Sequence, residues 1–186
     1  SEYSARDQPW RYLFQTTDVV MGTSLCLAGL ATLAWARHRP LGRQGWSGIG
    51  FVVGGLFSVL DALVTMDCSP TRSPACMAAE EAGHVSASHI VHVGTSTVVV
   101  IGFALPILLL NSTMTRFRGF GLVVAWAWVI FTLLNGIGAM DWFNGTPMNY
   151  TGIWQRLSLG LGTLWWLTLA ADDVITARAR NHVPSC

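Results

Sequence analysis

The clearest indication of the class of this protein comes from residues 86–110, which read SASHIVHVGTSTVVVIGFALPILLL. This stretch holds no Asp, Glu, Lys or Arg. As an α-helix rising about 1.5 Å per residue, it is long enough to cross ~30 Å of hydrocarbon. Four more long apolar stretches alternate with polar connections. We therefore predict an all-α membrane bundle, a single domain over residues 1–186, with five spans at about 17–36, 46–66, 86–110, 120–140 and 153–174.

The composition agrees with a membrane protein in contact with lipids. Hydrophobic residues make up 52% of the 186 residues and charged residues only 11%, whereas a soluble domain carries about 25% charged residues. The net charge of +1 provides no basic surface for nucleic acid, so we expect no such partner. All eleven basic residues are Arg, which together with the many Ala, Gly, Val and Leu residues favours a bacterial source. The expected location is the inner (plasma) membrane.

The placement of Arg predicts the orientation. Cytoplasmic loops of membrane proteins carry an excess of basic residues. With five spans, the first connection, the third connection and the C-terminal tail share one side and hold seven of the eleven Arg residues: Arg37, Arg39, Arg43, Arg116, Arg118, Arg178 and Arg180. We predict that this side is cytoplasmic. The N-terminus and the long loop 67–85 then lie outside, and the C-terminus lies in the cytoplasm.

Two cysteines give an independent indication of the outer side. Cys68 and Cys76 both fall within the loop 67–85. Outside the cytoplasm two such thiols oxidise to a disulfide that closes a short loop. The alternative, two free thiols, requires a reducing compartment, which the Arg pattern disfavours. Cys26 lies within a predicted span, where we expect it to pack against other helices.

Ionisable and polar residues near the outer ends of the spans are the candidates for function. Groups of this kind are costly inside a membrane and therefore face the bundle interior or a functional site. His89 and His92 lie about 60° apart on one helical face, and Ser88, Thr95 and Ser96 extend that polar stripe. The outer ends also carry Asp61, Asp67, His84 and Arg156.

One interpretation of these residues is catalytic. His89, His92 and a carboxylate from a neighbouring helix, Asp61, could bind zinc with one open position. A zinc-bound water would be a nucleophile at neutral pH. In this hypothesis the protein is a metal-assisted hydrolase of a lipid or lipid-linked substrate in the outer leaflet. The catalytic set is then Asp61, Asp67, His84, Ser88 and Arg156, with Ser88 and Arg156 positioning the substrate.

The other interpretations need no reaction. Histidines at a helix entry often bond to carboxylates or backbone carbonyls and join helices, and Asp61 could form a buried ion pair with Arg156. The protein would then be a membrane scaffold or an accessory subunit of a larger membrane complex, with a partner membrane protein. A proton-coupled carrier is a third possibility, which the scarcity of ionisable groups in the cytoplasmic half disfavours. The residues alone leave the choice between enzyme and non-enzyme open.

Short motifs along most of the chain resemble one known family. They are Tyr3-Ser4 followed by Trp10 and Phe14, Gly54-Gly55-Leu56-Phe57 followed by an aspartate, a histidine entering the next span, and Gln155-Arg156-Leu157. This pattern is similar to the uncharacterised membrane proteins of domain-of-unknown-function family 998. The resemblance implies a six-helix pattern, so the first helix of that pattern is expected upstream of Ser1. It implies no reaction.

A second, weaker similarity concerns chemistry alone. The spacing of Ser88 and His92 resembles part of the signature of alkaline ceramidases and adiponectin-receptor-type membrane hydrolases. Those proteins place a Ser, an Asp and three His around zinc, with two of the His in their last helix. Here the last predicted span contains no His. His84 and His89 would have to replace that pair from a single helix, which is poor geometry for three ligands.

Overall fold

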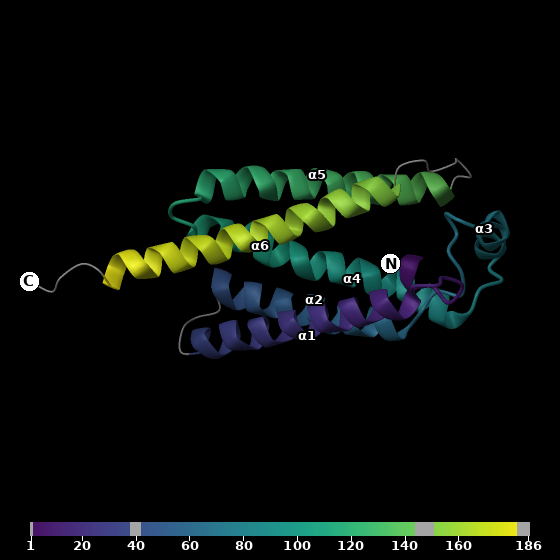
Figure 1. Cartoon of the computed structure of the whole chain (residues 1–186), viewed down its shortest axis with the longest axis horizontal. Helices are drawn as coiled ribbons and strands as arrows, with labels where there is room; N and C mark the ends of the chain where they lie inside the picture. The colour runs from purple at the N-terminus through teal and green to yellow at the C-terminus, as the bar shows by residue number, and fades with distance from the viewer. Residues whose placement is uncertain (1, 38–41, 144–150, 182–186) are drawn as a thin grey trace, which may run out of the picture. The chain divides into compact units, whose positions relative to one another are not determined.

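The computed structural model describes residues 2–37, 42–143 and 151–181, with side chains placed for 2–37, 42–137 and 152–179. Throughout these residues the secondary structure is helical and includes no strand. The α-helices are α1 (Arg11–Ala36), α2 (Arg43–Leu63), α3 (Pro74–Glu81), α4 (Ala87–Leu110), α5 (Arg118–Phe143) and α6 (Thr151–Asn181) (Figure 1). Two short 3-10 helices, Glu2–Ser4 and Asn111–Thr113, lie before α1 and after α4. The all-α prediction is confirmed.

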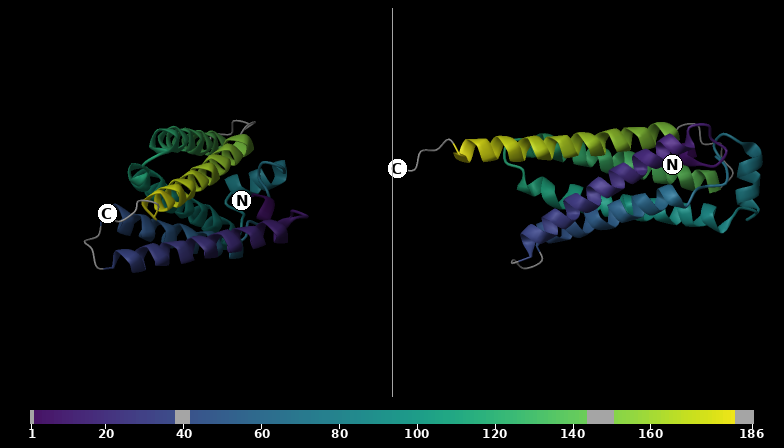
Figure 2. Two further views of the ribbon diagram at one scale, coloured as in Figure 1. Left: turned by 60° about the vertical axis from the view of Figure 1, so that its left-hand side comes forward. Right: turned by 60° about the horizontal axis from the view of Figure 1, so that its bottom comes forward.

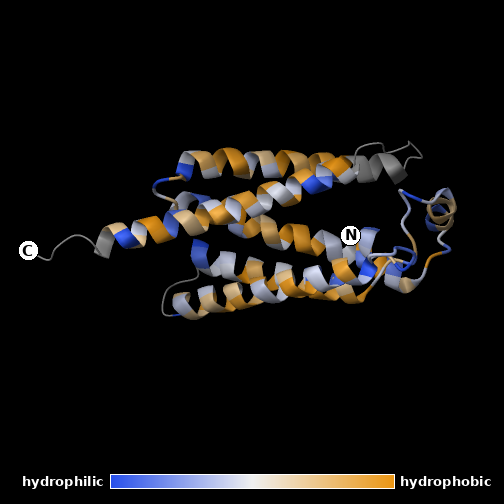
Figure 3. Cartoon of the chain, in the orientation of Figure 1, coloured by the Kyte–Doolittle hydropathy of each residue, from blue (hydrophilic) through white to orange (hydrophobic). Residues whose placement is uncertain are grey.

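Four of the helices are long and apolar enough to cross a membrane: α1, α2, α4 with its extension to Thr113, and α5 over residues 118–137. Figure 3 shows apolar residues along these helices and hydrophilic residues in the segments before α1 and α4. The predicted fifth span, 153–174, forms α6 but is not among the four. Its Gln155, Arg156 and Asp172 and its several Trp and hydroxyl residues lower its hydropathy. Its passage through the membrane stays a prediction.

The chain forms two compact units, residues 1–106 and 107–186, and each is described by itself. In the first unit α1 and α2 pack side by side (Figures 1 and 2). Gly22 and Gly55 meet at this contact. A Cβ atom on Gly55 would lie 2.5 Å from the carbonyl oxygen of Gly22, and one on Gly22 would lie 2.6 Å from that of Gly55. Glycine at both positions therefore permits a close approach of the two backbones.

Helix α4 also packs against α2 through a close contact between glycines. A Cβ atom on Gly102 would lie 2.5 Å from the backbone nitrogen of Gly54, so these helices too are in backbone contact. This contact places the N-terminal half of α4 beside the C-terminal half of α2. The end of α2 and the start of α4 consequently meet at one end of the unit, which is the predicted outer end.

In the second unit α5 and α6 pack against each other. Trp165 of α6 is fully buried, and its indole Nε1–H donates to the side-chain oxygen of Asn111 at 3.4 Å. Gly162 leaves room for the Trp128 indole, whose Nε1 would lie 3.3 Å from a Cβ added there. The positions of Arg39 and the side chain of Arg180, which the orientation argument used, lie outside the described residues.

Candidate functional site

The predicted polar residues of the first unit gather at the junction between the end of α2 and the start of α4. Asp67 lies in the segment after α2, and its carboxylate accepts from the Ser86 backbone N–H at 2.6 Å and the Ser86 hydroxyl at 2.8 Å. The Ser86 Oγ in turn accepts from the His89 backbone N–H at 3.3 Å, which is the bonding of a helix N-cap. Asp67 and Ser86 thus cap the N-terminus of α4, where the helix dipole favours negative charge.

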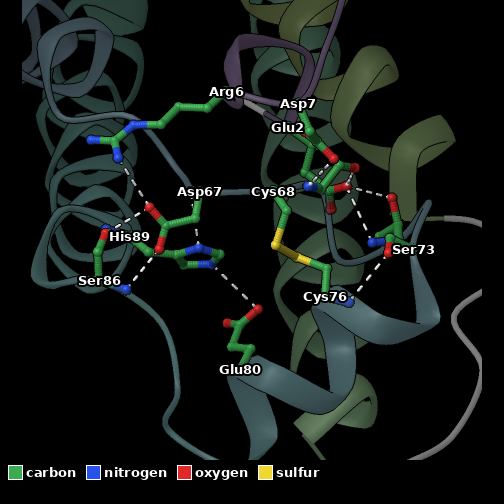
Figure 4. Close-up of a disulfide and its surroundings, with 12 residues drawn as sticks. Glu2, Arg6, Asp7, Asp67, Cys68, Ser73, Cys76, Glu80, Ser86 and His89 are labelled. Carbon is green, nitrogen blue, oxygen red and sulfur yellow. Dashed lines mark hydrogen bonds and ion pairs between the residues drawn. A yellow bond between two sulfur atoms is a disulfide. The ribbon is translucent and has the colours of Figure 1, made fainter.

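These contacts set the protonation of Asp67. The hydrogen bond from the Ser86 backbone holds the pKa of the Asp67 carboxyl below its ordinary value, and the Ser86 hydroxyl and the Arg6 guanidinium act in the same direction against some desolvation. Arg6 approaches the carboxylate to 3.3 Å, with both side chains partly exposed. Figure 4 shows Asp67 between Arg6 and Ser86. Asp67 is therefore an ionised cap and a weak proton acceptor.

His89 bonds to the same segment through its ring. Its Nδ1 accepts from the backbone N–H of Asp67 at 3.2 Å, and the side chain is 1% exposed. Because a neutral imidazole has a single lone pair, this bond places the ring proton on Nε2. That nitrogen lies 3.4 Å from Oε2 of Glu80, in α3 (Figure 4). Burial raises the pKa of the Glu80 carboxyl above its ordinary value, although the neighbouring His89 acts in the opposite direction.

His92, one turn further along α4, bonds to the C-terminal carbonyls of α2. Its Nδ1 lies 2.7 Å from the Val64 carbonyl oxygen and 3.1 Å from that of Asp61. Carbonyl oxygens only accept, so Nδ1 carries the proton and Nε2 keeps the lone pair. The Ser88 hydroxyl adds a bond of 2.9 Å to the Thr65 carbonyl. Side chains of α4 thus satisfy carbonyls that the end of α2 leaves without helical partners.

Asp61 points from α2 towards the hydroxyls of α4. The Thr95 hydroxyl donates to its Oδ1, and the Ser96 hydroxyl lies 3.0 Å and 3.1 Å from its two carboxylate oxygens. The Nδ1 of His92 is 3.4 Å from Oδ1. Asp61, Thr95 and Ser96 therefore form one polar cluster below the helix ends, as the predicted stripe on α4 implies.

The disulfide predicted between Cys68 and Cys76 is present, with a Cα–Cα distance of 6.0 Å. It joins the segment after α2 to α3, an eight-residue helix within the loop 67–85 that the sequence analysis did not predict. Ser73 caps α3 by accepting from the Cys76 backbone N–H at 3.2 Å. Gly83, with a φ of 69°, ends the turn after α3 in a conformation that favours glycine. The disulfide and these caps hold Glu80 over His89.

The N-terminal arm, residues 2–10, is bonded to the same loop. The sequence analysis did not predict these bonds. The Glu2 carboxylate accepts from the hydroxyls of Ser69 and Thr71. The Arg6 backbone N–H donates to the Met66 carbonyl at 3.0 Å. Further bonds join Asp7 to Ser69 and Gln8 to Arg72. We call residues 2–10 and 64–86 together the outer cap, a name that follows the predicted orientation. The high density of polar residues in the arm was the available signal.

Of the two remaining predicted site residues, one lies in the first unit and one in the second. His84 is in the turn after α3 with an exposed side chain, and in the described part of the chain no hydrogen bond or ion pair joins that side chain to the other predicted site residues. Arg156 belongs to α6 in the second unit, where its guanidinium donates to the Gly152 carbonyl at 3.1 Å. Asp61, Asp67, Ser88, His89 and His92 are brought together; their predicted catalytic roles stay untested predictions.

The predicted zinc ligands do not fit a metal site in this arrangement. Zinc takes the lone pair of a neutral imidazole, usually with the other ring nitrogen donating to an oxygen. His92 has that tautomer, but the lone pair of His89 is already used by the Asp67 backbone N–H. Nor do three or more His, Cys, Asp or Glu side chains group to hold a metal ion anywhere in the described ranges. No step of a reaction is therefore derived through zinc.

A second capping cluster lies in the second unit. The Asp172 carboxylate, from α6, accepts from three consecutive backbone N–H groups before α5: Thr115 at 2.9 Å, Arg116 at 2.7 Å and Phe117 at 2.9 Å. Asp172 is 2% exposed. A carboxylate here accepts from the free backbone donors at the start of α5. Its negative charge is stabilised by the positive end of the helix dipole. It fastens α6 to α5. No local pattern predicts this role for Asp172, since its partners are far away along the chain.

Four long apolar helices and polar residues engaged in helix capping define a polytopic α-helical membrane protein. The comparison with family models agrees. Residues 1–172 match the family described as "Protein of unknown function (DUF998)", so the chain belongs to that family, as the motifs indicated. Comparisons with curated proteins and with solved structures found no match.

Proposed function

We propose that this protein is a non-catalytic membrane scaffold or accessory subunit, whose outer cap binds a partner membrane protein. One observation carries this proposal: at the α2–α4 junction the Asp67 carboxylate and the Nδ1 atoms of His89 and His92 are engaged with backbone groups. A catalytic base or metal ligand needs a lone pair available to a substrate or metal. Groups that cap helix ends instead hold the outer cap in one shape, which is what a binding surface requires.

The proposed topology has five spans, including α6, with the N-terminus outside and the C-terminus in the cytoplasm of a bacterial cell. Two features of the first unit support it. The disulfide lies in the outer cap, which is expected in an oxidising compartment. Arg37 directly follows α1 and Arg43 begins α2, so both lie at the ends of these helices that are far from the outer cap. Basic residues are expected there if that side is cytoplasmic. Exposed apolar residues of α1, such as Leu27 and Leu30, would contact membrane lipids.

Site-specific photocrosslinking tests the proposal. A photoreactive residue replaces Glu81, which is exposed in α3, and in a matched control it replaces Leu27, which is exposed in the apolar span α1. In intact membranes we expect a discrete protein adduct from position 81 and none from position 27. Failure to form an adduct at 81, at Ala82 and at His84, all exposed in the cap, contradicts a partner on this surface.

Metal analysis tests the catalytic alternative in the same preparation. We expect no stoichiometric zinc in the purified protein or in its His89→Ala/His92→Ala double variant. About one zinc per chain, lost in the double variant, would instead establish the metal hydrolase. Lipid substrates would then be screened.

A further inference from the structure

Asp61 is a carboxylate within a membrane-spanning helix. It lies in the last turn of α2, one of the four candidate spans, and is 9% exposed. An ionised carboxylate within a span is costly and is usually compensated by a cation or a proton. The groups around Asp61 therefore decide how the charge of its carboxylate is compensated.

The direct partners of Asp61 are neutral hydroxyls. Ser96 and Thr95 each have a single hydroxyl proton. The Thr95 hydroxyl also lies 2.9 Å from the His92 carbonyl, so its proton is shared between two acceptors. Around Asp61 the acceptor atoms thus outnumber the protons available to them. These hydroxyls bond to the carboxylate without neutralising its charge.

His92 is an ionisable neighbour of Asp61. It is the ion-pair partner of Asp61 within the described residues, at 3.4 Å, but its Nδ1 proton has the closer Val64 carbonyl as acceptor. Its Nε2 lone pair is buried without a partner, in a side chain that is 1% exposed. Asp18 of α1 interacts electrostatically with both Asp61 and His92 and adds a second carboxyl group. Asp61 is therefore accompanied by one further carboxyl group from α1 and one imidazole from α4, so the acidic groups outnumber the basic one.

We propose that Asp61, Thr95 and Ser96 form a binding site for one small monovalent cation, Na⁺ or a proton. The carboxylate and the two hydroxyls are hard oxygen donors, which suit a hard cation and not zinc. A bound Na⁺ would take lone pairs from these oxygens. The site is independent of the partner-binding role of the outer cap.

Cation-dependent thermal stability of the full chain tests the site. A ligand that binds only the folded state raises the unfolding temperature as its concentration rises. One series varies NaCl against choline chloride at constant ionic strength and fixed pH, and a second varies pH without Na⁺. Each is repeated on Asp61→Asn, which keeps the shape and removes the charge. Stabilisation by Na⁺ that Asp61→Asn lacks identifies a Na⁺ site. A pH dependence without a Na⁺ response, reduced in Asp61→Asn, identifies a proton site.

Hydroxyl variants provide the second measurement. Ser96→Ala and Thr95→Val each remove one oxygen, and we expect the half-saturating cation concentration to change roughly tenfold, as for a lost hydrogen bond to a charged group. Thr97→Val is the matched control, since Thr97 is exposed on α4 and its hydroxyl bonds to the Val93 carbonyl of its own helix. The proposal is overturned when the stability of the wild-type chain responds to neither Na⁺ nor pH. It is also overturned when Asp61→Asn responds as the wild type does. If Asp61→Asn does not fold, Ser96→Ala and Thr95→Val take its place in this comparison.

Discussion

At the residue scale, the histidines of α4 act through their hydrogen-bonding tautomers. His89 accepts from the backbone after α2 and His92 donates to a carbonyl of α2, so the two rings carry their protons on different nitrogens. A sequence shows that two imidazoles share a helical face. It does not show which backbone groups they meet, because those groups belong to another helix. The zinc hypothesis combined the first fact with a carboxylate expected from a neighbouring helix, Asp61.

Replacing His92 with Ala should destabilise the fold. The Val64 carbonyl would lose its donor in a buried position, and an unsatisfied buried acceptor costs about 1–3 kcal/mol. Denaturant unfolding in detergent measures the effect. His84→Ala is the control, because its side chain is exposed, and it should change stability by less than about 0.5 kcal/mol. Equal effects of the two substitutions would contradict a capping role for His92.

Glu80 provides a prediction of pH dependence. Burial raises the pKa of its carboxyl in the folded protein, so between the ordinary value of 4.5 and the raised pKa the folded state binds more protons than the unfolded state. The contribution of Glu80 to stability therefore falls as pH rises through this window. Glu80→Gln should be more stable than the wild type at neutral pH, with the difference shrinking towards pH 4.5. Chemical unfolding at several pH values measures this, and a neutral-pH loss of stability in Glu80→Gln would contradict it.

At the element scale, the membrane helices are joined by glycines and by the caps at their ends. The long apolar stretches predicted where four of the helices run. The helix α3 escaped prediction because the disulfide and the Ser73 cap stabilise a segment too short to be recognised by periodicity. The bonding of Asp172 to the start of α5 escaped for a related reason, since a cap from another helix has no local signature.

Gly55→Ala should weaken the contact between α1 and α2. The added Cβ would lie 2.5 Å from the Gly22 carbonyl oxygen, a backbone atom that cannot move without shifting the helix. Forcing an extra carbon into such a contact costs about 1–3 kcal/mol. Gly160→Ala is the control, because a Cβ there meets nothing within 4 Å. Thermal unfolding in detergent compares the two, and an unaffected Gly55→Ala protein would contradict the close approach.

At the scale of the whole molecule, the number of spans decides where the C-terminus lies. With α6 as a fifth span the C-terminus is cytoplasmic, and with the four candidate spans alone both termini share one side. We expect a C-terminal green fluorescent protein fusion to fluoresce and a C-terminal alkaline phosphatase fusion to be inactive. An active phosphatase fusion would reverse this and limit the chain to four spans.

The class of protein, the family, the disulfide and four spanning helices could all be derived from the order of amino acids. Each depends on local information: the length of an apolar run, the spacing of a motif, or two cysteines in one loop. The roles of the polar residues could not be derived in this way. From the sequence, His89, His92 and Asp67 are equally compatible with metal ligands and with helix caps. The packing of the end of α2 beside the start of α4 shows the bonds that they make. Hydrogen bonds between residues distant in the chain depend on packing, and packing alone brought the Asp61 carboxylate to the hydroxyls of Thr95 and Ser96.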